Sequence, residues 1–360
     1  MARLVREGEV AVEVPEKVFY NPKMEVNRDL SVALLKIARP ELRDYVDATA
    51  ATGVLGLRVA KETRQKGLVL NDVNPRAARL LRRNAKRNRV ACEVRNENAN
   101  VLFHGRRFDG VDLDPFGSPA PFLDGAARSA LRFLAVTATD RAVLCGSHPA
   151  GPRNYGAATL LTEDHPEVGL RVLAGSVLRH LALHDKGGTL LFSVSHAHFY
   201  RLWLKVKESA AAGDRALESL GFISRCACGF RGVHPGLAPP LPERCPECGK
   251  RARRAGPLHL GGLADRRLAA RLARFLDGRE WPHAPAEARL AARSAEEVEA
   301  VGYYEFHPLC REAGVEPPPL EEFLETLRGR GYRASRTVFS GTGLKSDASK
   351  RELVEALKSF

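Results

Sequence analysis

The chain has 360 residues, 44% hydrophobic and 28% charged, which is a globular balance with room for two or three domains. No run of about 18 apolar residues occurs, and residues 1–7 are charged, so we expect no membrane span, no secretory signal and a cytoplasmic location. The formal net charge of +13 favours a polyanionic partner such as nucleic acid. An anionic membrane surface or a basic proteome would explain the same charge.

Strand and helix patterns alternate along the first part of the chain. Residues 9–14 alternate between apolar and polar and predict a strand, and the next helix is expected from an N-cap at Asp29 to Pro40. A strand at 45–49 enters a small-residue turn at 48–56, which opens onto a helix at 57–63. A strand at 67–73 then precedes an arginine-rich helix at 75–88.

The same alternation continues to about residue 222. Further strands are predicted at 91–94, 108–113, 141–145 and 188–195, with helices at 124–133 and 167–184. Strands that alternate with helices predict an α/β fold with a parallel, doubly wound, Rossmann-like sheet. The composition then changes, so we expect a domain at 1–222, a small cysteine-bearing insert at 223–256, and a mostly helical α+β domain at 257–360 with helices at 264–276, 285–300 and 319–328.

The turn at 48–56 is a candidate nucleotide site. Its glycines, including Gly53, let the backbone approach a ligand, and the following helix offers free N–H groups. The spacing is not G-x-G-x-x-G, which argues for a ligand other than a dinucleotide pyrophosphate. Asp72 follows about 20 positions later, where an acidic residue can hold ribose hydroxyls. The alternative role for Asp72 is an N-cap of the helix at 75–88.

The tetrapeptide Asp-Pro-Phe-Gly at 114–117 follows a predicted strand. Open α/β sheets place their chemistry at the carboxyl ends of the strands, so Asp114 and Phe116 are expected to project into such a site. The alternative is ordinary turn chemistry, in which the Asp-Pro and Phe-Gly pairs only shape a loop. Asp112 lies two positions earlier and is expected on the same face of the strand, as an internal control for Asp114.

Four of the seven cysteines lie within 23 positions of one another. Their C-x-C and C-x-x-C spacing predicts a zinc site with four thiolate ligands. Four protein ligands leave no open position, so we expect the zinc to be structural. The alternative is a set of reduced thiols without a metal. The predicted ligands are Cys226, Cys228, Cys245 and Cys248.

The segments 47–58, 71–73, 98–100 and 112–117 together resemble the ordered motifs of class I S-adenosylmethionine-dependent methyltransferases. More narrowly, the chain resembles the tRNA (guanine(26)-N2)-dimethyltransferase family. This narrower resemblance rests on residues 19–29, 135–140, 144–149 and 335–345, in family order along nearly the whole chain. It implies a methyltransferase sheet and transfer of one or two methyl groups from S-adenosylmethionine to N2 of guanine 26 in tRNA. The residues 257–360, with basic positions such as Arg333, Arg336 and Lys345, are expected to bind the tRNA backbone. No obligate protein partner is inferred.

The resemblance also implies roles for individual residues. Asp114 and the Pro115 carbonyl accept hydrogen bonds from the guanine amine, and Phe116 and Phe19 flank the base. Asn98 stands where the family usually has an acidic residue; an amide still accepts from the adenine amine, but altered affinity is expected. The implied cofactor-binding residues are Arg28 and Arg58 at the methionine carboxylate, Asp72 at the ribose, Asn98 and Ala99 at the adenine, and Asp47 and Gly53 in the glycine turn.

Two other functions fit parts of this pattern. A methyltransferase acting on adenine N6 or cytosine N4 in DNA or rRNA would use a similar loop after the strand, but the C-terminal third argues against it. A non-catalytic RNA-binding zinc protein with a degenerate core is disfavoured by the intact set of Asp47, Gly53, Asp72 and Asp114. Binding of the cofactor distinguishes the second alternative from an enzyme.

Overall fold

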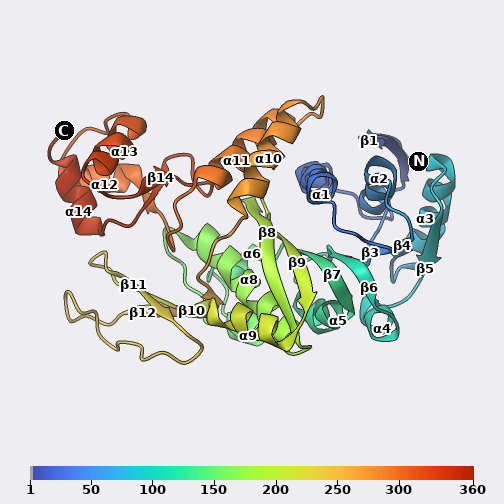
Figure 1. The fold of residues 1–360 in the computed structure, drawn as a ribbon, viewed down its shortest axis with the longest axis horizontal. Coiled ribbons are helices and arrows are strands. Elements are labelled where there is room, and N and C mark those ends of the chain that lie inside the picture. The colour runs from blue at the N-terminus through green and yellow to red at the C-terminus, as the bar shows by residue number, and fades with distance from the viewer. Residues whose placement is uncertain (1–2) are drawn as a thin grey trace.

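The computed structural model describes residues 3–360 (Figure 1). Residues 1 and 2, part of the charged start from which no secretory signal is expected, lie outside the described residues. The largest sheet in the described chain has seven strands in the order β5-β4-β3-β6-β7-β9-β8. The strands are β3 (Tyr45–Asp47), β4 (Leu68–Asn71), β5 (Cys92–Arg95), β6 (Phe108–Leu113), β7 (Ala130–Ala138), β8 (Lys186–His196) and β9 (Phe199–Glu208).

The predicted doubly wound α/β sheet is confirmed, but two of its strands, β7 and β9, were not predicted. Strands β5, β4, β3, β6 and β7 pair in parallel, as expected for strands joined by helices. Strand β9 pairs antiparallel with both β7 and β8, so the sheet is mixed. The sequence pattern predicted β8 but not its hairpin partner β9.

Helices cover both faces of the sheet. One face packs against α4 (Ala99–Gly105), α5 (Leu123–Ser129) and α8 (His165–Ala182), and the core there includes Phe103, Ala126 and Leu173. The other face packs against α1 (Glu25–Ala38) and α2 (Val54–Thr63), whose core residues include Leu34 and Leu57. The remaining elements of this part are β1 (Arg3–Glu7), β2 (Val10–Val14), η1 (Pro22–Met24), α3 (Pro75–Asn88), η2 (Ala120–Phe122), α6 (Arg141–Leu144), α7 (Gly151–Tyr155) and α9 (Ala210–Glu218).

Three local predictions were wrong. Asp29 does not begin a helix: Asn21 caps η1, which runs directly into α1, and Asp29 is buried inside α1. Residues 141–145 form the short helix α6 and not a strand. The helix predicted at 124–133 ends at Ser129, because Ala130 begins β7, and short apolar runs fit either structure.

The cysteine-bearing segment forms a small antiparallel sheet in the order β11-β10-β12. Strand β10 pairs with both β11 and β12. This sheet extends slightly beyond both predicted limits, 223 and 256, because β10 begins at Leu220 and β12 ends at His259. Its strands are β10 (Leu220–Arg225), β11 (Arg231–Pro235) and β12 (Arg253–His259).

Packing divides the predicted third unit, 257–360. Helices α10 (Arg266–Asp277) and α11 (Ala284–Glu296) pack against α1 and share its apolar core, through residues such as Leu272 and Ala291. The elements after residue 303 have a core of their own around Phe323 and Leu353. They are β13 (Tyr304–Glu305), α12 (Phe306–Ala313), α13 (Leu320–Gly329), β14 (Ala334–Arg336), β15 (Gly343–Ser346) and α14 (Lys350–Leu357).

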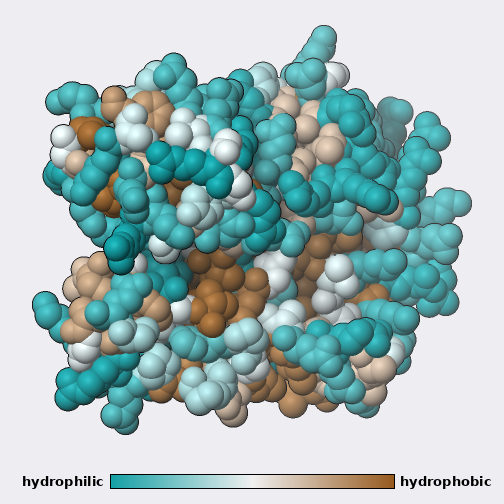
Figure 2. All heavy atoms as spheres, turned by 60° about the vertical axis from the view of Figure 1, so that its left-hand side comes forward, coloured by the Kyte–Doolittle hydropathy of each residue, from teal (hydrophilic) through white to brown (hydrophobic). Residues whose placement is uncertain are grey.

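The surface is mainly hydrophilic on the side that carries the C-terminal elements and β10–β12 (Figure 2). Apolar side chains gather there in a hollow between an upper and a lower lobe. Within residues 3–360, no helix combines the length and apolar character that crossing a membrane requires.

Candidate active site

A cavity of about 620 Å³ lies at the carboxyl ends of β3, β4 and β6. Its volume is in the range of small-molecule sites, and its position is the one where open α/β sheets bind ligands. The structure brings together here most of the site residues predicted from the sequence. Those that line the cavity are Phe19, Arg28, Asp47, Asp72, Asn98, Ala99, Asp114, Pro115 and Phe116.

Two predicted cofactor residues, Gly53 and Arg58, are not among the lining residues. Gly53 shapes the turn: its φ is +79°, and a Cβ there would lie 2.7 Å from a methyl carbon of Leu81. Arg58 is fully buried and pairs with Asp29 at 2.6 Å and with Glu62 at 2.8 Å. The guanidinium of Arg58 is therefore committed to carboxylates inside the fold.

Arg28 does reach the cavity. Its Nε and Nη2 donate to the two carboxylate oxygens of Glu7, at 2.6 and 2.7 Å. The phenol of Tyr20, another lining residue, also donates to Glu7, at 2.6 Å. Glu7 therefore fixes the position of the Arg28 guanidinium on the cavity wall.

The glycine turn presents a helix N-terminus to the cavity. Helix α2 begins after Gly53 without a side-chain cap, and its first residues Val54 and Leu55 line the cavity. The next N–H, that of Gly56, donates to Asp47 at 3.1 Å. Burial raises the pKa of the Asp47 carboxyl well above its usual value, and the nearby Asp112 adds to this effect.

Asp72 joins the glycine turn to the segment before α3. Its carboxylate accepts from the Ala51 N–H at 2.9 Å and from the Asn74 N–H at 2.8 Å. Asn74, and not Asp72, caps α3 by accepting from the Arg76 N–H. The alternative interpretation of Asp72 as the helix cap was therefore wrong.

The next strand end supplies an amide-rich wall. Asn98 caps α4 by accepting from the Asn100 N–H at 2.9 Å, and Ala99 follows in the first turn. Asn71 also lines the cavity, and its amide donates to the carbonyls of Ala48 and Glu97. Asn71 was not predicted to be a site residue, although it begins the motif at residues 71–73.

Asp114 follows β6 and is half-buried at the cavity. Its N–H donates to the Thr49 hydroxyl at 3.2 Å, and its Oδ2 accepts from the Asn27 amide at 3.1 Å. Burial raises the pKa of the Asp114 carboxyl, and the positive charge of Arg201 opposes that rise. Asn27 and Thr49 were missed because neither has a local sequence signal for contact with Asp114.

Two phenylalanine side chains are exposed beside Asp114. Phe116 is 87% exposed and Phe19 is 58% exposed, which is unusual for large apolar residues. Their ring centroids are 5.7 Å apart in an edge-to-face arrangement. They form an aromatic surface at the cavity next to a carboxylate.

Asp112 is part of the core and does not line the cavity. It accepts from the Tyr45 phenol at 2.7 Å and from both terminal nitrogens of Arg201, at 3.0 and 2.5 Å. Asp112 is therefore unsuitable as the internal control for Asp114, because its substitution would break a buried ion pair.

The chain matches the family model of N2,N2-dimethylguanosine tRNA methyltransferases over residues 2–358. A relative from Methanoculleus marisnigri, named tRNA (guanine(26)-N(2))-dimethyltransferase, is 44% identical over 334 residues, 92% of this chain and 89% of the relative. The chain belongs to this family. A relative of the same name from Methanosarcina acetivorans is 38% identical and is aligned over 100% of this chain and 99% of its own.

A solved structure of a family protein has the same fold. It is Trm1 from Pyrococcus horikoshii in complex with S-adenosyl-L-methionine, which is 34% identical to this chain. The TM-score is 0.90, and the match covers 98% of this chain and 99% of the other. The predicted family and methyltransferase fold are confirmed, whereas the individual site assignments stay predictions.

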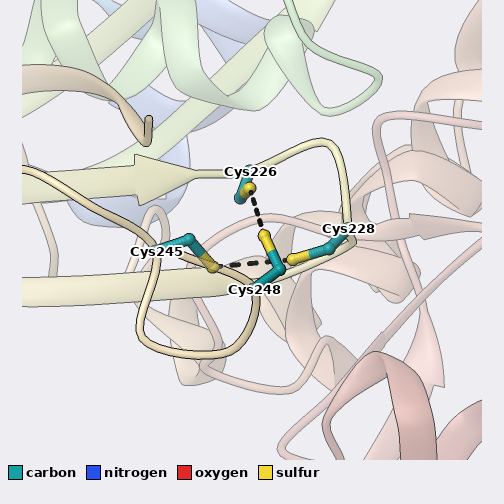
Figure 3. A group of neighbouring side chains, drawn as sticks. All are labelled: Cys226, Cys228, Cys245 and Cys248. Carbon is teal, nitrogen blue, oxygen red and sulfur yellow. Dashed lines mark hydrogen bonds between the residues drawn. The ribbon is translucent and has the colours of Figure 1, made fainter. Parts of the chain in front are cut away.

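The present chain also contains the predicted cysteine cluster (Figure 3). The four Sγ atoms lie within 4.8 Å of one another, and the closest pairs, Cys226 with Cys248 and Cys228 with Cys245, are 3.5 Å apart. Tetrahedral zinc with Zn–S bonds near 2.3 Å places sulfur atoms about 3.8 Å apart. The donor type and spacing therefore fit zinc.

Proposed function

We propose that this chain transfers methyl groups from S-adenosylmethionine to the exocyclic N2 of guanine 26 in tRNA. The observation that carries the proposal is the half-buried Asp114 carboxylate, placed between a cofactor-sized cavity and two exposed phenylalanine rings. A carboxylate accepts hydrogen bonds from an amine, and exposed aromatic rings stack on an extruded base. Family membership gives this arrangement its substrate.

The cavity suits S-adenosylmethionine. Arg28 offers a cation for the methionine carboxylate, and the uncapped start of α2 offers N–H groups. Asp72 is placed to accept from ribose hydroxyls, and Asn98 from the adenine amine. We do not extend this role to Arg58, which is fully buried and does not line the cavity.

Replacing Asp72 with alanine is expected to weaken S-adenosylmethionine binding at least about tenfold, because charge-assisted bonds to the ribose are worth about 1.5–3 kcal/mol. Calorimetric titration measures this affinity. Asn74→Ala is the matched control: it removes the α3 cap but no cavity-lining side chain, so affinity should stay near that of the unmodified protein. Unchanged affinity in Asp72→Ala would show that Asp72 only holds the turn.

The geometry supports a direct transfer. When bound, S-adenosylmethionine supplies an electrophilic methyl group. The N2 lone pair of guanine is delocalised into the ring. Asp114 and the Pro115 carbonyl therefore assist by accepting hydrogen bonds from the N–H groups of the amine, which aligns its lone pair with the methyl group. Asn27 occupies Oδ2 of Asp114 and so fixes the orientation of the carboxylate. The amine loses one proton for each methyl gained, and Asp114 accepts it.

The two phenylalanines must move for a base to stack between them. Their centroids are 5.7 Å apart, whereas a base with both faces in contact needs about 7 Å between rings. Because both rings are exposed, little packing opposes their separation. Stacking is worth about 1–3 kcal/mol per base, which offsets part of the cost of extruding the guanine.

The cysteine cluster is proposed to bind one structural zinc, with tight turns at Gly229 and Gly249 (φ +102° and +71°) below the thiolates. About one zinc per chain is expected by metal analysis, and Cys248→Ser should lose most of it while S-adenosylmethionine affinity stays the same. Cys92→Ser, on β5, is the control that keeps the metal. Absence of zinc from protein purified under reducing conditions would contradict this proposal.

We propose that tRNA is bound partly by the C-terminal elements, but not through Lys345, one of the three basic residues expected to bind it. Lys345 is buried and pairs with Glu167 and Glu297, at 3.0 and 3.2 Å. Arg333 and Arg336 also have carboxylate partners, Asp347 and Glu321. Lys345 is therefore unavailable to phosphates, whereas the ion pairs of Arg333 and Arg336 lie at the surface, are weak, and leave these two side chains able to contact tRNA.

The product of methyl transfer tests the proposed function. An unmodified tRNA transcript is incubated with the protein and labelled S-adenosylmethionine, then digested to oligonucleotides to locate the label and to nucleosides to identify the modified base. Label in N2-methylated guanosine from position 26 supports the proposal. Label in adenosine or cytidine would instead identify an exocyclic N-methyltransferase of another specificity.

A further inference from the structure

A second pocket of about 430 Å³ lies next to the catalytic cavity. It is formed by the start of α1, the turn between β8 and β9, helix α11, and Val338. We call it the flanking pocket. The residues used in the argument are Lys23, Val26, His196, Arg289, Leu290 and Arg293.

Two segments of the chain contribute residues to both the flanking pocket and the catalytic cavity. In the first, Asn21 and Met24 line the cavity while Lys23 lines the flanking pocket. In the second, His198 lines the cavity while His196 lines the flanking pocket. Asn21 and His198 are 3.1 Å apart and join the two segments. An RNA strand with one nucleotide in the catalytic cavity would bring the adjoining nucleotide to these two segments.

The flanking pocket is cationic. Lys23, Arg289 and Arg293 are exposed, and none of them has an ion-pair partner in the part of the chain that the structure describes. The pKa of His196 is lowered by partial burial and by the positive charge of His283 and His198 nearby. A ring nitrogen of His283 lies 3.8 Å from the carboxylate of Glu25.

The remaining walls are apolar or neutral. Val26, Leu290 and Val338 provide apolar surface. Glu287 is buried at the pocket, and burial together with the nearby Asp29 raises its pKa to about 9. Its carboxyl is therefore mostly protonated at neutral pH and does not repel an anion. Unbalanced cations beside an apolar wall match the phosphate and the base of a nucleotide.

We propose that the flanking pocket receives the nucleotide adjoining the target guanine in the tRNA strand, with its phosphate at Arg289 and Arg293 and its base on the apolar wall. This inference rests on the proposed function. Enzymes that act on an extruded base also contact its −1 and +1 neighbours, which sets the sequence context they accept. The arrangement makes the flanking pocket a determinant of which guanine enters the cavity.

The test measures tRNA binding with two matched changes. Arg289→Ala/Arg293→Ala removes the cations from exposed positions of α11, and transcripts with a neutral methylphosphonate on one side or the other of guanine 26 remove the phosphate charge. The arginine variant alone should bind the unmodified transcript about tenfold more weakly, the value of a charge-assisted contact. The neutral linkage on one side of guanine 26 should weaken binding to the unaltered protein by the same factor. Combining the variant with that linkage should cause no further loss, because both remove the same contact. Arg267→Ala, an exposed position on α10, is the control that stays sensitive to the neutral linkage.

Independent effects would overturn the inference: losses that multiply for both linkages, or no loss in the arginine variant. Affinity for S-adenosylmethionine should be unchanged in all variants, which checks that they are folded. Methylation of the unmodified transcript by the unaltered protein is measured in parallel. Failure there contradicts the proposed function, whereas the binding cycle tests the flanking pocket separately.

Discussion

Asp114→Asn is expected to lower the rate of methyl transfer about 100-fold or more, the range for a positioned acid or base. The amide keeps the shape of the side chain but cannot take up the amine proton, and its NH2 can turn toward the substrate amine. Affinity for S-adenosylmethionine and the unfolding midpoint should change little. Single-turnover kinetics with tRNA measures the chemical step directly.

The matched control for this variant is Asp214→Asn, at an exposed position on α9 outside the cavity. It should keep the rate of the unaltered protein.

Burial raises the pKa of Asp114, so activity should fall with acidification at a higher pH than for an ordinary carboxyl, because protonation removes the acceptor. That acidic limb should be missing from Asp114→Asn. A rate near that of the unaltered protein would move the chemistry away from Asp114.

Asp112→Ala is expected to destabilise the fold by about 3–5 kcal/mol, because it leaves the buried guanidinium of Arg201 without its carboxylate partner. Urea denaturation of the unaltered and variant proteins measures the difference. The double variant Asp112→Ala/Arg201→Met should lose less than the sum of the two single losses, because no unpaired charge remains. Additive losses would contradict a direct coupling of the two side chains.

The architecture of the first 222 residues was largely predictable because its elements are local patterns. Apolar runs bounded by Gly, Pro and Asn locate β4, β6 and β8, and these signals do not depend on distant contacts. Strand β9 was missed although Phe199–Glu208 carries a local strand signal, aromatic and aliphatic residues that follow β8 after two residues. The helices α10 and α11 were recognised, but their packing on α1 joins segments over 200 residues apart, which no local pattern specifies.

In the candidate site too, residues with a local sequence signal were predicted and contacts between distant segments were not. Asp72, Asn98 and Asp114 were predicted because each follows a strand, and strand ends meet at one edge of a parallel sheet. The bond from Asn27 to Asp114 joins residues 87 positions apart and has no local signal. Arg58 was assigned to the cofactor, but its burial among carboxylates from several elements is a tertiary property.

Two tRNA transcripts that differ only at position 26 test the central claim most directly. One carries guanosine and the other inosine, which has the same ring but lacks the exocyclic amine. Because Asp114 is proposed to act on that amine, methyl groups should be transferred to the guanosine transcript and none to position 26 of the inosine transcript, although both should bind. Equal labelling of the two transcripts would contradict methylation at N2 of guanine 26.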